Sequence, residues 1–272
     1  MQTHFALRSL SANGPDKDVQ VLFSTRPNRK AVLFIHGFGG NPINTWSDFH
    51  ELLPENPNCC HDMFFYGYDG LRAEMNASAA MFCDFLERFF TATNALLVAA
   101  NLPSEAQRPA HFCYDQLIIV AHSLGAVITR RALLDATHSK LPWVTKTKMV
   151  LYAPAHKGAV VADLALEAAS SFPFLRLFGI GARFASPLID ALKPNSASLT
   201  ALLQETMAAT QGGANAHLIA SHVVIAEFEK IVSNDRFGND PRPTAIPDAT
   251  HTSICKPTRA SLDPLRILER YL

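Results

Sequence analysis

The sequence predicts an α/β fold, a three-layer sandwich with a mostly parallel central sheet and helices on both faces. The first observation behind this prediction is that short apolar runs alternate with longer amphipathic runs along the chain. The second is that a chain of 272 residues, 48% of them hydrophobic, can bury a substantial core. No shift in composition divides the chain, and we therefore expect one domain spanning residues 1–272.

The N-terminal part predicts one edge of the sheet and its first buried strands. Residues 5–10 and 19–24 flank the turn signal Asn13-Gly14-Pro15, which predicts an antiparallel hairpin. Residues 31–35 are entirely apolar and predict a buried strand, and residues 63–66 predict another. A glycine-containing turn follows each of these two strands.

The rest of the chain continues the alternation. Residues 78–100 carry apolar side chains at helical spacing and predict a helix that stops before Pro103. The further expected elements are strands at 117–121, 149–153 and 223–226 and helices at 124–136 and 262–272. In such a sheet the loops converge at the carboxyl ends of the strands, and we expect the active groups there.

Charge and cysteine content exclude several function classes. Lys+Arg and Asp+Glu number 24 each, so no net field would draw the chain to nucleic acid, and we expect no such partner. The five cysteines have neither C-x-x-C nor zinc-like spacing, which predicts reduced thiols, no metal site and a cytoplasmic location.

Hydropathy predicts no membrane-spanning segment. The N-terminus lacks the long apolar run of a secretory signal. The most apolar later run, residues 170–189, is interrupted by Pro173, Arg176 and Arg183, whereas a spanning helix needs about 20 mostly apolar residues. The low share of charged residues, 18%, is compatible with apolar surface and with transient contact to a lipid interface.

Residues 117–127 contain the most informative motif, because an apolar strand ends at Ser123 and a helix-like run begins at once. This is the pattern of a nucleophile elbow, a tight turn that lifts a serine hydroxyl clear of the sheet and beside the amides of the new helix. The positions two before and two after the serine must be small, and Ala121 and Gly125 qualify. The alternative interpretation is a buried strand followed by a helix with a serine cap.

A serine nucleophile needs a histidine base, and the chain order in hydrolases with this elbow is serine, acid, histidine. His251 fits this order, because it follows the last expected strand and precedes the closing helix. His36 lies upstream of the serine, His122 adjoins it and His156 directly follows the strand at 149–153. The sequence therefore predicts His251 as the base.

Two backbone amides are needed to hold the oxyanion of a tetrahedral intermediate. One should be the N–H of Leu124, directly after the serine, and the other should come from the turn that follows residues 31–35, where Phe38 is the best candidate. The alternative function of this glycine-rich turn is a phosphate cradle, but the chain lacks G-x-x-x-x-G-K-[ST].

Three carboxylates follow the strand at 223–226, and one of them should orient the base. In hydrolases the acid commonly follows this strand and is followed by x-[IV]-V, a spacing that selects Glu229. Asp235 is the alternative acid, ahead of Glu227. Aspartate is more usual here and one methylene shorter, so with Glu229 we expect the loop to sit slightly further from the histidine.

Five motifs in family order resemble the α/β-hydrolase serine esterases and lipases, specifically the branch akin to the GPI-inositol-deacylase-like lipases and serine-active-site proteins. The motifs are Phe34-Ile35-His36-Gly37-Phe38-Gly39-Gly40, Thr45-Trp46, Ala121-His122-Ser123-Leu124-Gly125, Ala153-Pro154-Ala155-His156-Lys157-Gly158 and His251-Thr252-Ser253-Ile254-Cys255-Lys256-Pro257. The resemblance implies the α/β-hydrolase fold and ester hydrolysis without metal or organic cofactor. The departures from the family pattern are Ala121 for glycine and Glu229 for aspartate.

Between His156 and residue 223 lies a long insertion, and we expect residues 159–218 to form a cap or lid over an apolar acyl pocket. The alternative is that its aromatic side chains simply pack onto the sheet. The expected substrate contacts are His36, Gly37, His122, Phe178 and Phe184.

The sequence thus predicts a serine hydrolase that cleaves a small-molecule or lipid ester through an acyl-enzyme on Ser123. Two alternatives stay open at this point. The same three catalytic groups serve acyl transfer and thioester cleavage, and a hydrolase fold can also act as a binding module without catalysis.

Overall fold

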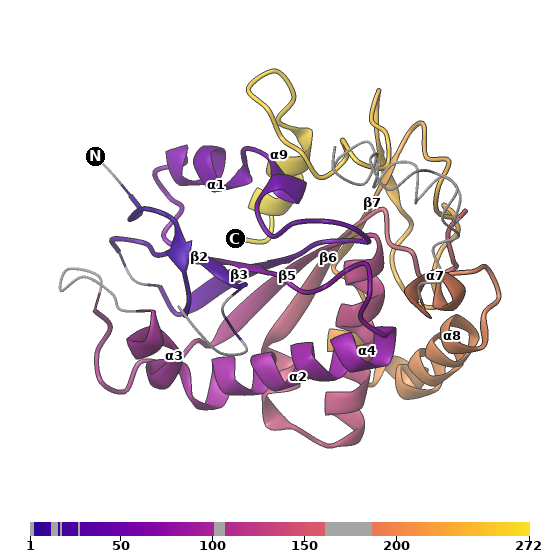
Figure 1. The fold of residues 1–272 in the computed structure, drawn as a ribbon, viewed down its shortest axis with the longest axis horizontal. Helices are drawn as coiled ribbons and strands as arrows, with labels where there is room; N and C mark the ends of the chain where they lie inside the picture. The colour runs from indigo at the N-terminus through magenta and orange to yellow at the C-terminus, as the bar shows by residue number, and fades with distance from the viewer. Residues whose placement is uncertain (1–2, 12–15, 17, 27, 101–106, 161–186) are drawn as a thin grey trace.

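The computed structural model describes residues 3–11, 16, 18–26, 28–100, 107–160 and 187–272, and the structural statements below concern these residues. They contain one sheet of eight strands in the order β1-β2-β4-β3-β5-β6-β7-β8 (Figure 1). The strands are β1 (Arg8–Ser9), β2 (Gln20–Leu22), β3 (Lys30–Ile35), β4 (Asp62–Tyr66), β5 (Gln116–His122), β6 (Thr147–Tyr152), β7 (His222–Ala226) and β8 (Thr244–Ile246).

The strand pairing confirms the expected mostly parallel sheet. From β4 through β3, β5, β6 and β7 to β8 every neighbouring pair is parallel, whereas β1 pairs antiparallel with β2 and β2 antiparallel with β4. The predicted hairpin is therefore present at the sheet edge. Because β3, β5, β6 and β7 run in the same direction, their carboxyl ends meet at one edge of the sheet, and the candidate site is built there.

Helices cover both faces of the sheet, as expected. Figure 1 shows α2 and α4 on one face and α1 and α9 on the other. The helices are α1 (Phe49–Leu52), α2 (Met75–Thr91), α3 (Thr93–Ala99), α4 (Leu124–His138), α7 (Pro187–Ala191), α8 (Ala197–Ala209) and α9 (Asp263–Glu269). The aromatic stripe of α2 is buried, with the Phe82 and Phe85 rings 4.8 and 5.2 Å from that of Tyr66 in β4.

The single helix expected over residues 78–100 is two helices. The backbone leaves the helical region at Ala92 (φ −127°, ψ 34°), between α2 and α3. The hydroxyls of Thr91 and Thr93 donate to the carbonyls of Glu87 and Phe89, four residues earlier, and such contacts bend helices. The apolar spacing continues across the break, so hydropathy alone does not detect it.

Two C-terminal elements also differ from expectation. The sheet has a further strand, β8, after β7, and His251 follows this strand. β8 has three residues, of which two are exposed, so it lacks the apolar run that predicts a buried strand. The closing helix, α9, spans Asp263–Glu269 rather than residues 262–272.

Part of the expected cap lies within the described residues. Residues 187–218 contain α7 and α8, and Arg131 of α4 forms an ion pair at 2.9 Å with Glu205 of α8. Residues 161–186 of the expected cap, which include Phe178 and Phe184, lie outside the described residues. Across the part of the chain that is described, no helix combines the length and apolar character needed to cross a bilayer.

Candidate active site

Ser123 occupies the sharp turn between β5 and α4. Its backbone has φ 51° and ψ −118°, in a region that L-residues rarely adopt, and its N–H donates to the carbonyl of Tyr152 in β6 at 3.0 Å. Gly125 lets the turn close, because a Cβ atom there would lie 2.4 Å from the carbonyl oxygen of His36 and 2.5 Å from that of Ile35. Ala121 is fully buried at the end of β5, and its methyl group is accommodated.

The turn after β3 lies directly against the serine. A Cβ atom on Gly37 would lie 2.9 Å from the Cβ of Ser123, so only glycine allows this approach. Backbone hydrogen bonds hold the turn, from Gly40 N–H to the Gly37 carbonyl at 3.1 Å and from Gly39 N–H to the Gly70 carbonyl at 3.2 Å. The second bond ties the turn to the loop that follows β4.

His36 shapes this turn from inside the protein. It is fully buried, its Nδ1 donates to the Gly37 carbonyl at 2.9 Å, and its ring stacks on Tyr68 with centroids 4.4 Å apart. The Tyr68 hydroxyl donates to the His36 carbonyl at 2.9 Å. Burial lowers the pKa of His36 to about 4, so the ring is neutral at neutral pH. Sequence reasoning missed Tyr68, although its position directly after β4, the neighbour of β3, was a signal for such a contact.

The oxyanion amides expected from the sequence are the N–H groups of Phe38 and Leu124. Among the described residues, no hydrogen bond leaves the Phe38 N–H, whereas the N–H groups of Gly39 and Gly40 in the same turn are both used. Leu124 is the first residue of α4, where helical N–H groups lack intrahelical acceptors. Within the described residues both amides are thus free of competing acceptors, and their role as an oxyanion hole stays a prediction.

His251 lies between the serine and a carboxylate. Its Nε2 is 3.1 Å from the Oγ of Ser123, and its Nδ1 is 3.1 Å from both carboxylate oxygens of Glu229. The side chain of His251 is 3% exposed and that of Glu229 is 0% exposed, so water does not compete for these contacts. The geometry assigns the proton to Nδ1, facing the acid, and the lone pair to Nε2, facing the hydroxyl.

Glu229 is held by its own turn as well as by the histidine. Its Oε1 accepts hydrogen bonds from the N–H groups of Ile231 at 2.9 Å and Val232 at 3.1 Å. Burial alone would raise the pKa of Glu229, but the hydrogen bond and charge of His251 and the two amides lower it below its usual value. The carboxylate is therefore ionised at neutral pH.

The other two candidate acids point elsewhere. Asp235 is 76% exposed, accepts a hydrogen bond from the Ser233 hydroxyl at 3.0 Å and lies 3.8 Å from the amine of Lys157. Glu227 accepts from the backbone N–H of Asp248 at 3.0 Å. Of the three carboxylates after β7, Glu229 is thus the one that contacts His251.

His122 links the serine strand to the loop of the base. Its Nε2 donates to the backbone carbonyl of His251 at 2.9 Å, and its ring lies edge-on to Trp46 with centroids 6.5 Å apart. Burial, followed by the nearby charge of His251, lowers the pKa of His122 well below its usual value, so this imidazole stays neutral. The expected contact of His122 with substrate stays a prediction, as do those of His36 and Gly37.

Arg130, about two turns into α4, contacts several segments that surround the site. Its side chain is 1% exposed, donates to the Leu218 carbonyl and pairs with Asp240 at 2.5 Å. Its Nε lies 3.2 Å from the Nε2 of His156, in the loop after β6. No sequence signal marked Arg130, because its partners lie up to 110 residues away along the chain. Within the described residues, no group of three or more His, Cys, Asp or Glu side chains is arranged to hold a metal ion.

Solved structures share this arrangement of strands over most of the chain. The mature lipase BlEst2 of Bacillus licheniformis superposes with a TM-score of 0.55 at 14% identity, over 89% of this chain and 91% of the lipase. The chain has the α/β-hydrolase fold. An inhibited esterase B from Lactobacillus rhamnosis gives a TM-score of 0.53 at 12% identity, over 98% of this chain and 86% of the esterase.

A third solved structure has the same fold. The monoacylglycerol lipase of Paleococcus ferrophilus gives a TM-score of 0.51 at 12% identity, over 90% of this chain and 94% of the lipase. No protein-family model and no curated protein sequence matches the chain. At these identities the likeness establishes the α/β-hydrolase fold, and the chemistry has to be argued from the site.

Proposed function

We propose that the protein is a serine hydrolase that cleaves carboxylic esters through an acyl-enzyme on Ser123. The observation that carries this proposal is the continuous contact from the Ser123 hydroxyl through His251 to the buried carboxylate of Glu229, at 3.1 Å for each step. A serine hydroxyl becomes an effective nucleophile when a neutral, oriented imidazole can take its proton.

In the first half-reaction, the Nε2 of His251 takes the proton of Ser123 while the serine Oγ attacks the carbonyl carbon of the ester. Negative charge then develops on the former carbonyl oxygen, and the N–H groups of Phe38 and Leu124 bind it. The tetrahedral intermediate collapses, the ester bond breaks, and His251 returns the proton to the departing alkoxide. Glu229 remains ionised throughout and stabilises the imidazolium.

In the second half-reaction, water takes the place of the alcohol. His251 removes a proton from the water, the hydroxide adds to the acyl carbon, and the same two amides bind the oxyanion. Collapse of this intermediate breaks the bond to Ser123, whose Oγ recovers the proton from His251, and releases a carboxylic acid. The net reaction consumes one water for each ester and needs no oxidant, reductant or metal.

The proposed substrate class is a small-molecule or lipid ester. Support comes from the fold shared with the two lipases and the esterase described above, which are named for the cleavage of esters. The narrower resemblance to the GPI-inositol-deacylase-like lipases rests on the five sequence motifs, and it favours a lipid ester within this class.

The test compares Ser123→Ala with Ser139→Ala. Ser139 is exposed and lies at the opposite end of α4, so its loss should leave the site intact. We expect the protein and the control variant to hydrolyse p-nitrophenyl esters and to be labelled by a fluorophosphonate probe, and Ser123→Ala to do neither. Turnover of the same esters by Ser123→Ala would contradict the mechanism.

The same assay separates the remaining alternatives. A thioester turned over much faster than the matched oxygen ester, or acyl transfer to an added alcohol in preference to water, would replace ester hydrolysis by thioester cleavage or acyl transfer. A folded protein that neither turns over any of these substrates nor accepts the probe would be a binding module.

A further inference from the structure

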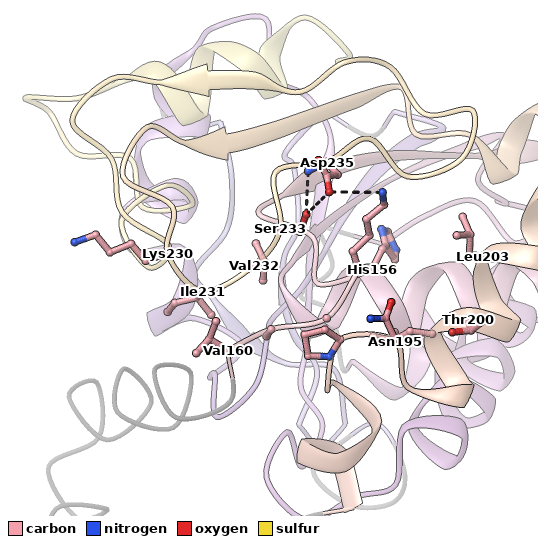
Figure 2. Close-up of a pocket in the computed structure, with 15 residues that line it drawn as sticks. His156, Val160, Asn195, Thr200, Leu203, Lys230, Ile231, Val232, Ser233 and Asp235 are labelled. Atoms are coloured by element: carbon pink, nitrogen blue, oxygen red, sulfur yellow. Dashed lines mark hydrogen bonds and ion pairs between the residues drawn. The ribbon is translucent and has the colours of Figure 1, made fainter.

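A hollow lies at the same edge of the sheet as the candidate active site. It has a volume of about 550 Å³ and is enclosed by three segments, the loop of residues 156–160 after β6, residues 194–203 around the start of α8, and residues 230–235 after the acid (Figure 2). Ser123, Glu229 and His251 are not among its lining residues. This volume is in the range of small-molecule binding sites, about 300–1,000 Å³.

Residues 230–232, which line one side of the hollow, belong to the turn that binds the Glu229 carboxylate. The N–H groups of Ile231 and Val232 bond the carboxylate of Glu229, and the Ile231 carbonyl accepts from the Val160 N–H at 2.7 Å. Ala159 and Val232 also form an antiparallel bridge. This side of the hollow is thus a hydrogen-bonded frame that includes the turn of the acid.

One part of the lining is apolar. Figure 2 shows Val160, Ile231 and Val232 on one side of the hollow and Leu203 on the other, and Leu199 of α8 also contributes. Val160 is 49% exposed, so about half of its surface can still be covered by a ligand. An alkyl chain placed between these walls would remove their apolar surface from water, which is favourable in proportion to the area covered.

The remaining lining is rich in hydrogen-bond donors. The amine of Lys157 has one partner within the described residues, the mostly exposed carboxylate of Asp235 at 3.8 Å, and exposed pairs at such a distance are weak. The amide of Asn195 and the hydroxyl of Thr200 take part in no side-chain hydrogen bond in the part of the chain that is described, and Figure 2 shows both at the same side of the hollow. Lys230 extends away from the other side chains.

His156 adds a buried polar atom to this lining. The residue is 3% exposed, and its Nδ1 has no hydrogen-bond partner among the described residues. A buried polar atom without a partner is costly, and a ligand or an ordered water that satisfies it would be stabilised. Apolar walls next to a cationic amine and neutral donors favour a ligand with a short alkyl chain and an anionic acceptor group.

We propose that this hollow is a second binding site, separate from Ser123, for an amphiphilic carboxylate. The carboxylate would displace Asp235 from the amine of Lys157 and accept from Asn195 and Thr200, while the chain lies along Val160, Leu199 and Leu203. The proposal goes beyond ester hydrolysis and is tested without turnover. The acid released by ester cleavage belongs to the same chemical class, so such a ligand is present wherever the proposed reaction takes place.

The test measures binding of octanoate to the whole protein by isothermal titration calorimetry. Thr200 is exposed on α8, and Thr200→Trp should fill the hollow and abolish binding. Gln204→Trp is the matched control, because Gln204 is exposed one turn further along the same helix and does not line the hollow. We expect Gln204→Trp to bind octanoate as the unmodified protein does, and octan-1-ol to bind more weakly than octanoate.

Lys157→Gln is the second variant, with Lys148→Gln, an exposed lysine of β6, as its control. Loss of a partly exposed ion pair should raise the dissociation constant about two- to fivefold, while the control leaves it unchanged. Circular dichroism and thermal unfolding establish that each variant folds. Two results would overturn the proposal, whether or not the protein hydrolyses esters. One is that the unmodified protein does not bind octanoate at concentrations up to millimolar. The other is that Thr200→Trp and Lys157→Gln both bind octanoate as tightly as the unmodified protein does.

Discussion

Replacing Glu229 by glutamine should nearly abolish turnover, whereas replacing Asp235 by asparagine should not. Glutamine keeps the size of the buried side chain and an oxygen for the Ile231 and Val232 amides, but it removes the negative charge 3.1 Å from the Nδ1 of His251. The imidazolium then loses its counter-charge, and the tautomer that accepts the serine proton is no longer favoured. We expect kcat to fall about 10³–10⁴-fold, as for loss of the charged acid in other serine hydrolases.

Asp235 provides the matched control, because its carboxylate is 76% exposed and its lysine contact is 3.8 Å long. Such a pair contributes about 0.2–1 kcal/mol, and we expect kcat for Asp235→Asn within about fivefold of the unmodified value. Initial rates on a short p-nitrophenyl ester, normalised by active-site titration, give the comparison. If Asp235→Asn lost activity while Glu229→Gln kept it, the assignment of the acid would be wrong.

Three further predictions concern the surroundings of the triad. The pKa of His36 is about 4 in the folded protein, against an ordinary value of 6.5. As the pH falls, the unfolded chain therefore binds a proton at this residue before the folded protein does. The free energy of unfolding should thus decrease by about 3 kcal/mol between pH 6.5 and 4. Urea unfolding at several pH values measures this, and His36→Asn should flatten the slope. His122→Phe removes the bond to the His251 carbonyl, so we expect kcat to fall about tenfold with KM little changed. An unchanged kcat would show that the base loop needs no such anchor. In Gly125→Ala the added Cβ meets carbonyl oxygens at 2.4 and 2.5 Å, which should cost about 1–3 kcal/mol in thermal or urea unfolding and lower probe labelling of Ser123.

The sequence was sufficient to predict the order and type of the central elements. Strands such as β3 and β5 are entirely apolar over most of their length, and that pattern depends on burial alone. β8 was missed because a three-residue edge strand with two exposed side chains is defined by its pairing with β7 and not by hydropathy. The break at Ala92 was missed because the apolar stripe has the same period on both sides of it.

The candidate site followed from motif spacing, and the structure places its members in contact. Ser123 could be selected because it directly follows a buried strand, and Glu229 and His251 because they come after the last expected strand in the order serine, acid, histidine. The support around them was not predictable. Tyr68 reaches His36 because β3 and β4 are neighbours, and Arg130 reaches Asp240 across 110 residues, so both contacts depend on the assembled fold and not on local pattern.

The turn that follows Glu229 fits an acidic side chain of one particular length. A single carboxylate oxygen bonds two amides of its own turn and also the imidazole, so the acid and the peptide that carries it form one rigid unit. Aspartate at this position would withdraw the carboxylate by about 1.5 Å, the length of one carbon–carbon bond, and it could keep either the amides or the histidine but not both. The glutamate is therefore matched to this backbone, and transferring a triad between hydrolases of this fold requires moving the turn together with the acid.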